Sequence, residues 1–262
     1  MGKSSYYLGI DVGSTASKCV ILDKTGRIIG SGIVSSGAGT KGPEDALEMA
    51  LKDAGIAYSD VSCSCSTGYG RHLLTWADFQ MSELSCHAKG GSRLFPTART
   101  LVDIGGQDAK VLSIGEGGTL KNFVMNDKCA AGTGRFLDVM ASIFGCNVSD
   151  LSALDAQSRK VVSISSTCTV FAESEVISKL ASGESIPDVA AGVHASVVER
   201  TAGLVKRIGI IPDVAMTGGV ALNDSLRSRL AEKLGVEIFT SPLAQLNGAL
   251  GAALFAGERV CA

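Results

Sequence analysis

The sequence predicts an α/β protein made of two similar domains, and two observations support this prediction. Along the 262 residues, short apolar runs alternate with segments of helical periodicity. A strand–turn–strand segment at residues 9–20 also recurs without a gap at residues 101–112. At roughly 90 residues the period is too long for a stacked repeat protein, and two copies are too few. We therefore expect two domains of one kind, at residues 1–100 and 101–244.

The first domain is expected to open with antiparallel strands. Apolar runs at residues 6–10, 19–22 and 27–33 are separated by turns that contain Asp and Gly. The elements expected after them are a helix at residues 43–54, a strand at 61–66 and a helix at 81–89 that ends at Gly90 and Gly91. A helix rich in Ala and Gly at residues 245–257 is expected to complete this domain by close packing.

The second domain is expected to be richer in helices. Its apolar residues Phe136, Leu137, Met140 and Phe144 recur with helical spacing, which predicts a helix at residues 133–144. Further helices are expected at residues 169–180, 189–208 and 223–234, and strands at 214–216 and 236–240.

Composition excludes several classes of protein. With 24 Lys and Arg against 26 Asp and Glu, the net charge of −2 argues against a nucleic-acid-binding protein. No apolar run reaches the ~18 residues of a membrane helix, and the first residues lack a signal-peptide pattern. We expect a cytoplasmic protein without a membrane partner. Disulfides are rare in the cytoplasm, so the 8 cysteines suggest metal, redox or catalytic chemistry more than disulfide bonds.

The duplicated Asp-x-Gly turns are candidate phosphate-binding sites. Glycine lets backbone N–H groups approach phosphate oxygens closely. Ser14 and Thr15 add hydroxyl donors, and Lys18 adds a positive charge. Because such a turn is also a common hairpin signal, each turn alone remains open to that interpretation. The matched pair, together with Gly218 and Gly219 after the strand at 214–216, favours a nucleotide site.

Three side chains in these turns are candidates for catalysis. Asp11 and Asp103 are suited to hold Mg²⁺ through water, because Mg²⁺ prefers oxygen ligands and retains several waters. Gln107, next to Asp108, lies where a side chain can orient water at a γ-phosphate. Lys18 is expected to contact phosphate, whereas its counterpart Lys110 is expected to be a solvated strand residue.

The set of motifs resembles the acetate and sugar kinase, Hsp70 and actin superfamily of ATPases. The resemblance implies two ribonuclease-H-like domains with a nucleotide cleft between them, formed by residues 9–18, 101–110 and 216–220. Neither a Walker-type nor a Rossmann-type glycine string is present in these turns. The implied ATP ligands are Gly13, Ser14, Thr15, Lys18, Gly105, Gly106, Gln107, Gly218 and Gly219.

Two cysteines differ from the other six in their setting. Cys129 and Cys168 lie in small, polar segments, at residues 125–136 and 164–175, just before predicted helices. A helix N-terminus favours the thiolate, which is the form that binds metal. Two thiolates fill half of a four-thiolate site, which a twofold dimer would complete. Cysteines of ordinary capping turns are the alternative. The other six are expected to be buried or terminal thiols.

These two segments, with residues 80–88 and the Gly-Gly motif, resemble the activators (component A) of 2-hydroxyacyl-CoA dehydratases. The resemblance implies a homodimeric ATPase with one [4Fe-4S] cluster between the subunits, ligated by Cys129 and Cys168 of each. ATP or ADP and Mg²⁺ are the other implied cofactors. The implied partners are a ferredoxin or flavodoxin, which donates an electron, and the dehydratase (component D), which receives it.

Two other functions remain open at this point. A small-molecule kinase of the same superfamily would use Asp103 or Asp108 as a base. A chaperone-like or actin-like ATPase would bind no cluster. Both alternatives leave Cys129 and Cys168 without a role.

Overall fold

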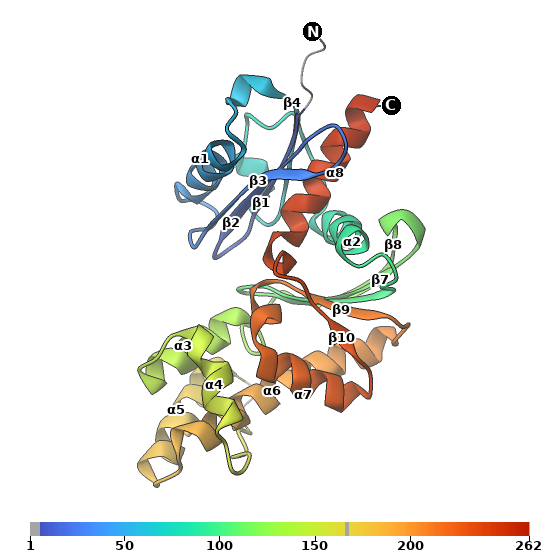
Figure 1. Cartoon of the computed structure of the whole chain (residues 1–262). Coiled ribbons are helices and arrows are strands. Elements are labelled where there is room, and N and C mark those ends of the chain that lie inside the picture. Colours follow the sequence, from blue (N-terminus) through green and yellow to red (C-terminus); the bar gives the residue numbers. More distant parts are fainter. Residues whose placement is uncertain (1–5, 166–167, 262) are drawn as a thin grey trace. The chain divides into compact units, whose positions relative to one another are not determined.

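The computed structural model describes residues 6–165 and 168–261 (Figure 1). The chain divides into two compact units. Unit 1 comprises Met1–Ala98, Ile114–Lys121 and Leu243–Ala262, and unit 2 comprises Arg99–Ser113 and Asn122–Pro242.

Unit 1 is built on a mixed sheet with the strand order β3-β2-β1-β4-β5. Its first three strands are antiparallel, as the sequence predicts, and β4 and β5 add to the sheet in parallel. The strands are β1 (Tyr6–Val12), β2 (Ser17–Leu22), β3 (Ile28–Val34), β4 (Val61–Thr67) and the unpredicted β5 (Phe79–Gln80).

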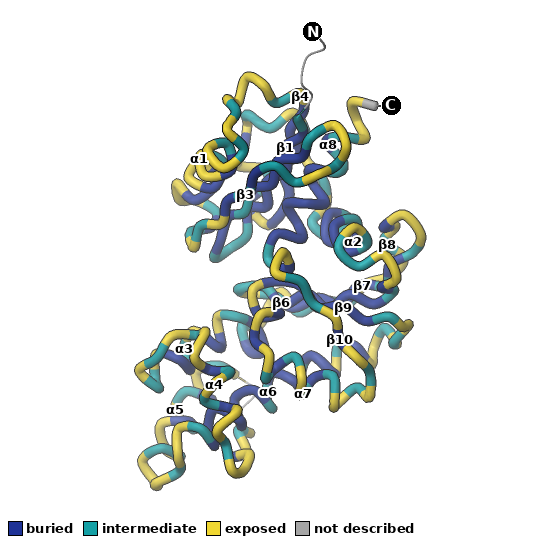
Figure 2. Tube along the Cα trace, viewed as in Figure 1, coloured by how far each residue is buried: buried dark blue, intermediate teal, exposed yellow. Residues whose placement is uncertain are grey.

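Helices cover this sheet and enclose two apolar cores. Helix α1 (Gly42–Ala54) packs on β2 and β3, and helix α8 (Asn247–Cys261) packs on β1, β2 and β4. Helix α2 (Glu83–Leu94) lies against α8. Figure 2 shows β1, between these layers, as buried.

Glycines allow α8 to approach its neighbours closely. A Cβ at Gly251 would overlap the Cys86 carbonyl oxygen of α2, and a Cβ at Gly9 of β1 would overlap the Ala249 carbonyl oxygen of α8. The expectation that the Ala- and Gly-rich C-terminal helix serves close packing is therefore confirmed.

The predicted end of α2 at Gly90 and Gly91 is wrong, because the helix continues to Leu94. A helix-ending glycine usually adopts a positive φ, as Gly55 does with φ 65° after α1. Neither Gly90 nor Gly91 has a positive φ. A Cβ at Gly90 would overlap the Asn247 carbonyl oxygen, so this glycine serves helix packing.

Unit 2 repeats the sheet of unit 1, with the order β10-β9-β6-β7-β8. Strands β6 and β7 are antiparallel, whereas β9 and β10 add in parallel, as in the first sheet. The strands are β6 (Thr100–Ile104), β7 (Ala109–Ile114), β8 (Leu120–Asn126), β9 (Val214–Thr217) and β10 (Ile238–Phe239). The duplicated sequence segment thus forms the first two strands of two sheets with equivalent strand order.

The helices of unit 2 follow the prediction apart from one addition. They are α3 (Gly134–Phe144), the unpredicted α4 (Leu151–Ala156), α5 (Thr169–Ala181), α6 (Ile186–Ile208) and α7 (Asp224–Leu234). Among the described residues, no single helix meets the length and apolarity needed to cross a membrane. One bent pair, Gly134–Phe144 with Val148–Ala156, meets them together by length and composition alone.

Candidate nucleotide and cysteine sites

The first Asp-x-Gly turn is a hairpin turn between β1 and β2 in unit 1. The Gly13 N–H donates to the Ala16 carbonyl over 3.0 Å, and the Gly13 carbonyl accepts from the Ala38 N–H over 2.9 Å. Ser14 and Thr15 are half-buried at the tip. The turn is therefore a hairpin turn, and it leaves the candidate phosphate-binding residues Ser14 and Thr15 partly accessible.

The carboxylate of Asp11 is enclosed at the end of β1. The residue is 4% exposed, and Oδ2 lies 3.3 Å from Lys18 Nζ. A Cβ at Gly248 would come within 2.9 Å of Oδ2, and a Cβ at Gly68 would overlap Oδ1. Sequence reasoning missed these two glycines. Because Gly68 and Gly248 have no side chain, there is room beside the Asp11 carboxylate. A side chain at either position would fill this room.

The second turn, in unit 2, places a buried lysine between two acids. Lys110 Nζ lies 3.2 Å from Asp103 Oδ1 and 2.6 Å from Asp108 Oδ2. Lys110 is 2% exposed, so the expectation of a solvated strand residue is wrong. Burial of a cation requires such partners, and the two carboxylates provide them. Gln107, at the tip of the turn, is exposed.

The Gly218-Gly219 motif lies beside the second turn. Because β9 is parallel to β6, Thr217 stands opposite Asp103, and its hydroxyl donates to Asp103 Oδ2 over 2.7 Å. Gly218 has φ 85°, and a Cβ there would overlap the Ile104 carbonyl oxygen. The fold therefore brings together two of the three predicted motifs within unit 2. Thr217 was not predicted, although it ends the strand that carries the motif.

Cys129 and Cys168 are exposed, and both belong to unit 2. Cys129 lies in the loop between β8 and α3, where its carbonyl accepts from Asn126 Nδ2 over 2.8 Å. Cys168 is the N-cap residue of α5, and its carbonyl accepts from the Ala172 N–H over 2.9 Å. Helices α3 and α5, which follow the two cysteines, pack against each other.

The other described cysteines are less accessible. Cys19, Cys63, Cys65 and Cys86 are buried, and Cys146 is intermediate. Burial raises the pKa of the Cys19 thiol, which disfavours its thiolate. Part of the predicted cysteine segments lies outside the described residues. This part is Ser166 and Thr167, in the segment at 164–175, and the side chain of Cys261.

The donor set of unit 2 fits half of a four-thiolate cluster site. Two exposed thiols stand on segments whose following helices pack together, and thiolates are the usual ligands of a [4Fe-4S] cluster. Among the described residues, no group of three or more His, Cys, Asp or Glu side chains could hold a metal ion. Two further thiolates would therefore have to come from outside these residues.

A cavity of about 600 Å³ opens beside Cys129. It lies between the Cys129 loop and the C-terminal half of α6. Its charged lining residues are Asp127, Lys128, Arg200 and Arg207, and Met125 and Leu204 contribute apolar surface. The surroundings of Cys129 are thus more cationic than the chain as a whole.

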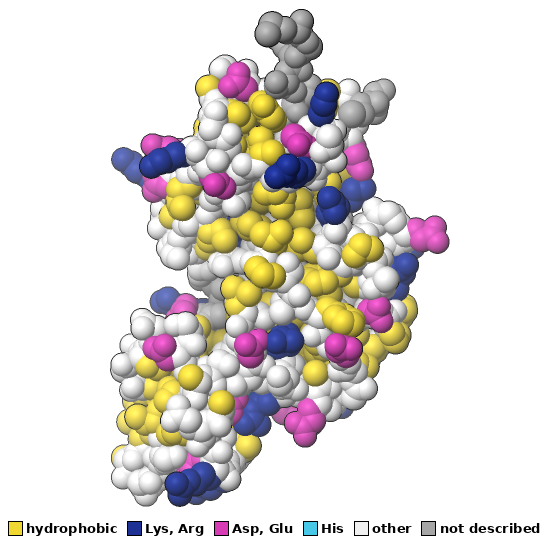
Figure 3. All heavy atoms as spheres, in the orientation of Figure 1, with side chains coloured by type: hydrophobic (Ala, Val, Ile, Leu, Met, Phe, Trp, Pro, Cys, Tyr) yellow, Lys and Arg dark blue, Asp and Glu magenta, His cyan; other side chains and the backbone are white. Residues whose placement is uncertain are grey.

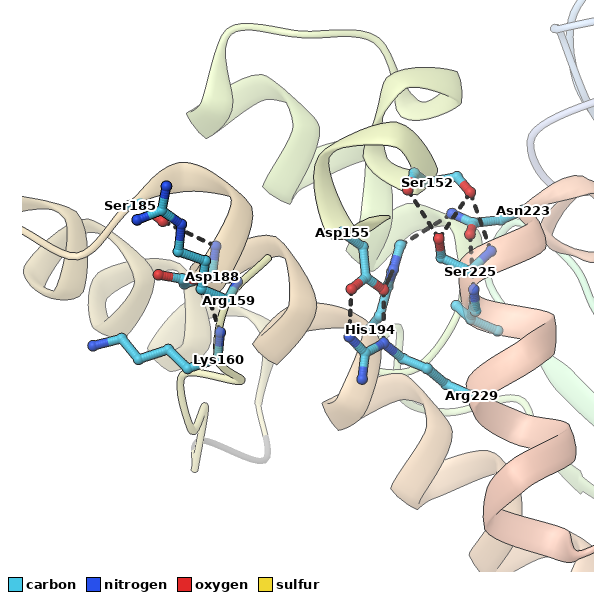
Figure 4. Close-up of polar contacts among 11 residues, drawn as sticks. Ser152, Asp155, Arg159, Lys160, Ser185, Asp188, His194, Asn223, Ser225 and Arg229 are labelled. Carbon is cyan, nitrogen blue, oxygen red and sulfur yellow. Dashed lines mark hydrogen bonds and ion pairs between the residues drawn. The ribbon is translucent and has the colours of Figure 1, made fainter. Parts of the chain in front are cut away.

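The segment that leads to Cys168 is anchored to the start of α6. Asp188 Oδ1 accepts from the Arg159 N–H over 2.7 Å and from the Lys160 N–H over 3.1 Å (Figure 4). Ser185 Oγ accepts from the Asp188 N–H over 3.3 Å and caps the helix.

A buried polar network joins α4, α6 and α7 in the same unit (Figure 4). His194 Nδ1 lies 2.7 Å from Asp155 Oδ2, and Asn223 Nδ2 lies 3.0 Å from His194 Nε2. Arg229 donates to both carboxylate oxygens of Asp155. His194 is therefore a fully buried residue with a polar partner at each ring nitrogen.

The network selects one tautomer of the neutral His194 ring. Asn223 Oδ1 accepts from the Leu226 N–H over 2.9 Å, so the amide nitrogen Nδ2 must be the atom that faces the imidazole. A donor facing Nε2 makes that nitrogen the acceptor. The proton of the neutral ring is then on Nδ1 and is donated to Asp155.

Two sheets of equivalent strand order, each with an Asp-x-Gly turn at the end of its first strand, define an α/β fold of two similar units. Residues 8–256 match the BadF/BadG/BcrA/BcrD ATPase family. The chain belongs to this family, and it is an ATPase.

Relatives of known name match along the whole chain. The (R)-2-hydroxyglutaryl-CoA dehydratase activating ATPase of Acidaminococcus fermentans is 58% identical over 257 residues, which cover 98% of each chain. The 2-hydroxyisocaproyl-CoA dehydratase activator of Clostridioides difficile is 53% identical over 251 residues, covering 96% of this chain and 94% of that one. A solved structure of the Clostridium difficile activator, with bound ADPNP, has a TM-score of 0.95 at 52% identity, covering 98% and 96% of the two chains.

More distant structures share the fold alone. A ROK family glucokinase from Streptomyces griseus matches with a TM-score of 0.56 at 13% identity, covering 97% of this chain and 99% of that chain. The predicted fold class is therefore confirmed.

Proposed function

We propose that this ATPase activates a 2-hydroxyacyl-CoA dehydratase by delivering a low-potential electron. The electron would come from a ferredoxin or flavodoxin and leave through a [4Fe-4S] cluster shared by two subunits. The observation that carries the proposal is the exposure of Cys129 and Cys168 in a chain that is 58% identical to a dehydratase-activating ATPase. A kinase or a cluster-free ATPase gives these two thiols no role.

The chain's own residues supply the means of holding the cluster. Cys129 and Cys168 of each of two subunits would provide its four thiolates. When bound, the cluster supplies a one-electron redox centre. Cys168, as the N-cap of α5, places its sulfur at the positive end of a helix, which favours an anionic ligand set.

An exposed apolar face next to Cys168 supports a homodimer. Val170, Phe171 and Ile177 of α5 are 65%, 69% and 50% exposed. Figure 3 shows hydrophobic side chains on the surface of this helical part of unit 2. Large exposed apolar groups of this kind mark association surfaces. A second copy that covers α5 would bring its own cysteines to the same place.

The nucleotide would be bound by both phosphate turns. We assign phosphate contacts to Gly13, Ser14, Thr15, Lys18, Gly105, Gly106 and Gln107, and adenosine contacts to Gly218 and Gly219. Asp11 and Asp103 would hold Mg²⁺ through water, and Gln107, which is exposed, would orient the attacking water. Units 1 and 2 would each act as one ribonuclease-H-like domain.

Anaerobic reconstitution with iron and sulfide tests the proposal. The wild-type chain is expected to turn brown and to retain about four irons per dimer. Cys129→Ala is expected to remain colourless, because one thiolate of each half-site is missing. Cys146→Ala, which removes a less exposed cysteine, is the matched control and should reconstitute like wild type. A colourless wild-type protein that phosphorylates a sugar or an acid would contradict the proposal.

A further inference from the structure

Helix α3 begins directly on the second phosphate turn. The Gly134 N–H donates to the Gly105 carbonyl over 2.9 Å, and the Arg135 N–H donates to the Gly106 carbonyl over 2.7 Å. The first N–H groups of a helix have no acceptor within the helix, and here the turn provides it. A Cβ at Gly134 would lie 3.0 Å from the Gly105 oxygen, which is a tight contact, so the absence of a side chain favours this close approach.

Thr133, the N-cap residue of α3, stands between this turn and the Cys129 loop. Its side chain is fully buried. Its Oγ1 lies 3.0 Å from the Gly106 carbonyl oxygen and 2.6 Å from the Ala130 carbonyl oxygen. A hydroxyl has one proton, and both neighbours are acceptors. Thr133 can therefore donate fully to the turn or to the residue after Cys129, but not to both at once.

Other contacts also hold the Cys129 loop, and one of them is the Thr133 N–H, which donates to the Ala130 carbonyl over 3.1 Å. The Asn126 amide holds the Cys129 carbonyl over 2.8 Å. Gly132 has φ 86°, and a Cβ there would lie 2.9 Å from Arg200 Cδ, so the stem of Arg200 packs on this turn of the backbone. A shift of the Gly106 carbonyl would thus reach the loop through Thr133.

We propose that Thr133 is a positioning residue that couples the nucleotide state of the Gly105–Gly106 turn to the conformation of the Cys129 loop. The inference rests on the proposed function for the turn and for Cys129, and it adds a route within unit 2. The Thr133 hydroxyl donates to the Ala130 carbonyl or to the Gly106 carbonyl, depending on the position of the Gly106 carbonyl in each nucleotide state. A hydrogen bond present in one state and absent in the other shifts an equilibrium by about fivefold.

The test measures the accessibility of Cys129 in cluster-free full-length protein. The alkylation rate of Cys129 by iodoacetamide is followed by mass spectrometry in Mg·ADP and in Mg·ADPNP. We expect the two rates to differ by about fivefold in wild type. Thr133→Val, which keeps the shape and removes the hydroxyl, should bring their ratio close to one. Thr133→Ser, which restores a hydroxyl, should regain most of the difference.

The matched control is Thr100→Val. Thr100 is also buried in unit 2, and its hydroxyl donates to the Ile211 carbonyl over 2.8 Å, away from the turn. This variant should keep the wild-type ratio, and Cys146 serves as the internal reference in every sample. If Thr133→Val does not fold, Thr133→Ala replaces it, because it also removes the hydroxyl and should likewise bring the ratio close to one.

Two results would overturn the inference. One is a wild-type alkylation rate that is the same in both nucleotides while both nucleotides bind. The other is an unchanged ratio in folded Thr133→Val, or in Thr133→Ala where that variant replaces it. Failure of the proposed function has a different signature, namely a wild-type chain that reconstitutes no cluster, and it leaves the alkylation result intact.

Discussion

At the scale of single residues, the buried Asp155 is the clearest electrostatic support of unit 2. Burial raises the pKa of this carboxyl, but hydrogen bonds from Arg229 and His194, together with the charge of Arg229, outweigh burial and hold the pKa at about 2. An unfolded aspartate has a pKa of about 3.9. The folded state thus binds the proton less tightly than the unfolded state.

The sign of the pH dependence follows from this difference. Because the folded pKa is the lower one, the stabilisation is fully present above about pH 4 and is lost as the pH falls towards about 2. Asp155→Asn removes this dependence and leaves Arg229 half-buried without its carboxylate. We expect the variant to lose about 3 kcal/mol of unfolding free energy at neutral pH.

Urea unfolding at several pH values measures both effects. Between about pH 4 and pH 2 the wild type should lose about 2 kcal/mol more than Asp155→Asn. Asp224→Asn is the control, because Asp224 is exposed and pairs only locally with Arg227 on α7. Parallel pH profiles for wild type and Asp155→Asn would contradict this account.

Asp11 and Asp103 are the residues whose substitution we expect to affect ATP hydrolysis. Either Asp→Asn change removes a charge that we assign to Mg²⁺ and should lower kcat by about a hundredfold. Chelation of Mg²⁺ should abolish turnover in wild type. Asp138→Asn, on the exposed face of α3, is the control and should turn over normally. Wild-type kcat in both variants would refute the assignment.

The sequence indicated part of the residue-scale picture. Asp11, Asp103 and their glycines were found because a duplicated turn is a local pattern. Thr133 and Thr217 were missed because each has a partner far along the chain. Thr133 reaches the Gly106 carbonyl, and Thr217 reaches Asp103 on the neighbouring parallel strand. Lys110 was misjudged because alternation in a strand does not reveal two facing acids.

At the scale of elements, α6 contains two glycines in opposite settings. A Cβ at Gly192 would overlap the Val162 carbonyl oxygen, in the segment that leads towards Cys168. A Cβ at Gly203, in the same helix, would meet nothing within 4 Å. One glycine is required by a close approach, and the other only weakens the helix.

The two Gly→Ala variants therefore separate packing from helix propensity. Gly192→Ala should destabilise the protein by about 3 kcal/mol, because Val162 must move. Gly203→Ala should stabilise it by about 0.5–1 kcal/mol. Urea unfolding midpoints measure both changes. A neutral Gly192→Ala would show that the 161–165 segment is not tightly packed on α6.

The elements themselves were largely predictable. The helices of strong periodicity and the antiparallel strands were found in place. The end of α2 was not, because a glycine that packs against a neighbouring backbone looks in the sequence like a glycine that ends a helix. Helix α4 and strand β5 are too short to show a period.

At the scale of the whole molecule, the internal repeat indicated the two equivalent sheets. The boundaries of the units are interleaved in a way that a linear pattern does not reveal. Ile114–Lys121 groups with unit 1, although the strand β7 that leads into it belongs mostly to unit 2. The half-site that we propose for Cys129 and Cys168 is likewise incomplete in one chain, and a second copy would have to complete it.

The central claim is that two chains share one cluster through Cys129 and Cys168. Native mass spectrometry of the anaerobically reconstituted protein tests it most directly. The account predicts a dimer whose mass exceeds that of two chains by one Fe4S4 unit, and loss of that unit in Cys168→Ala. Monomers that each carry their own cluster, or a dimer without iron, would contradict it.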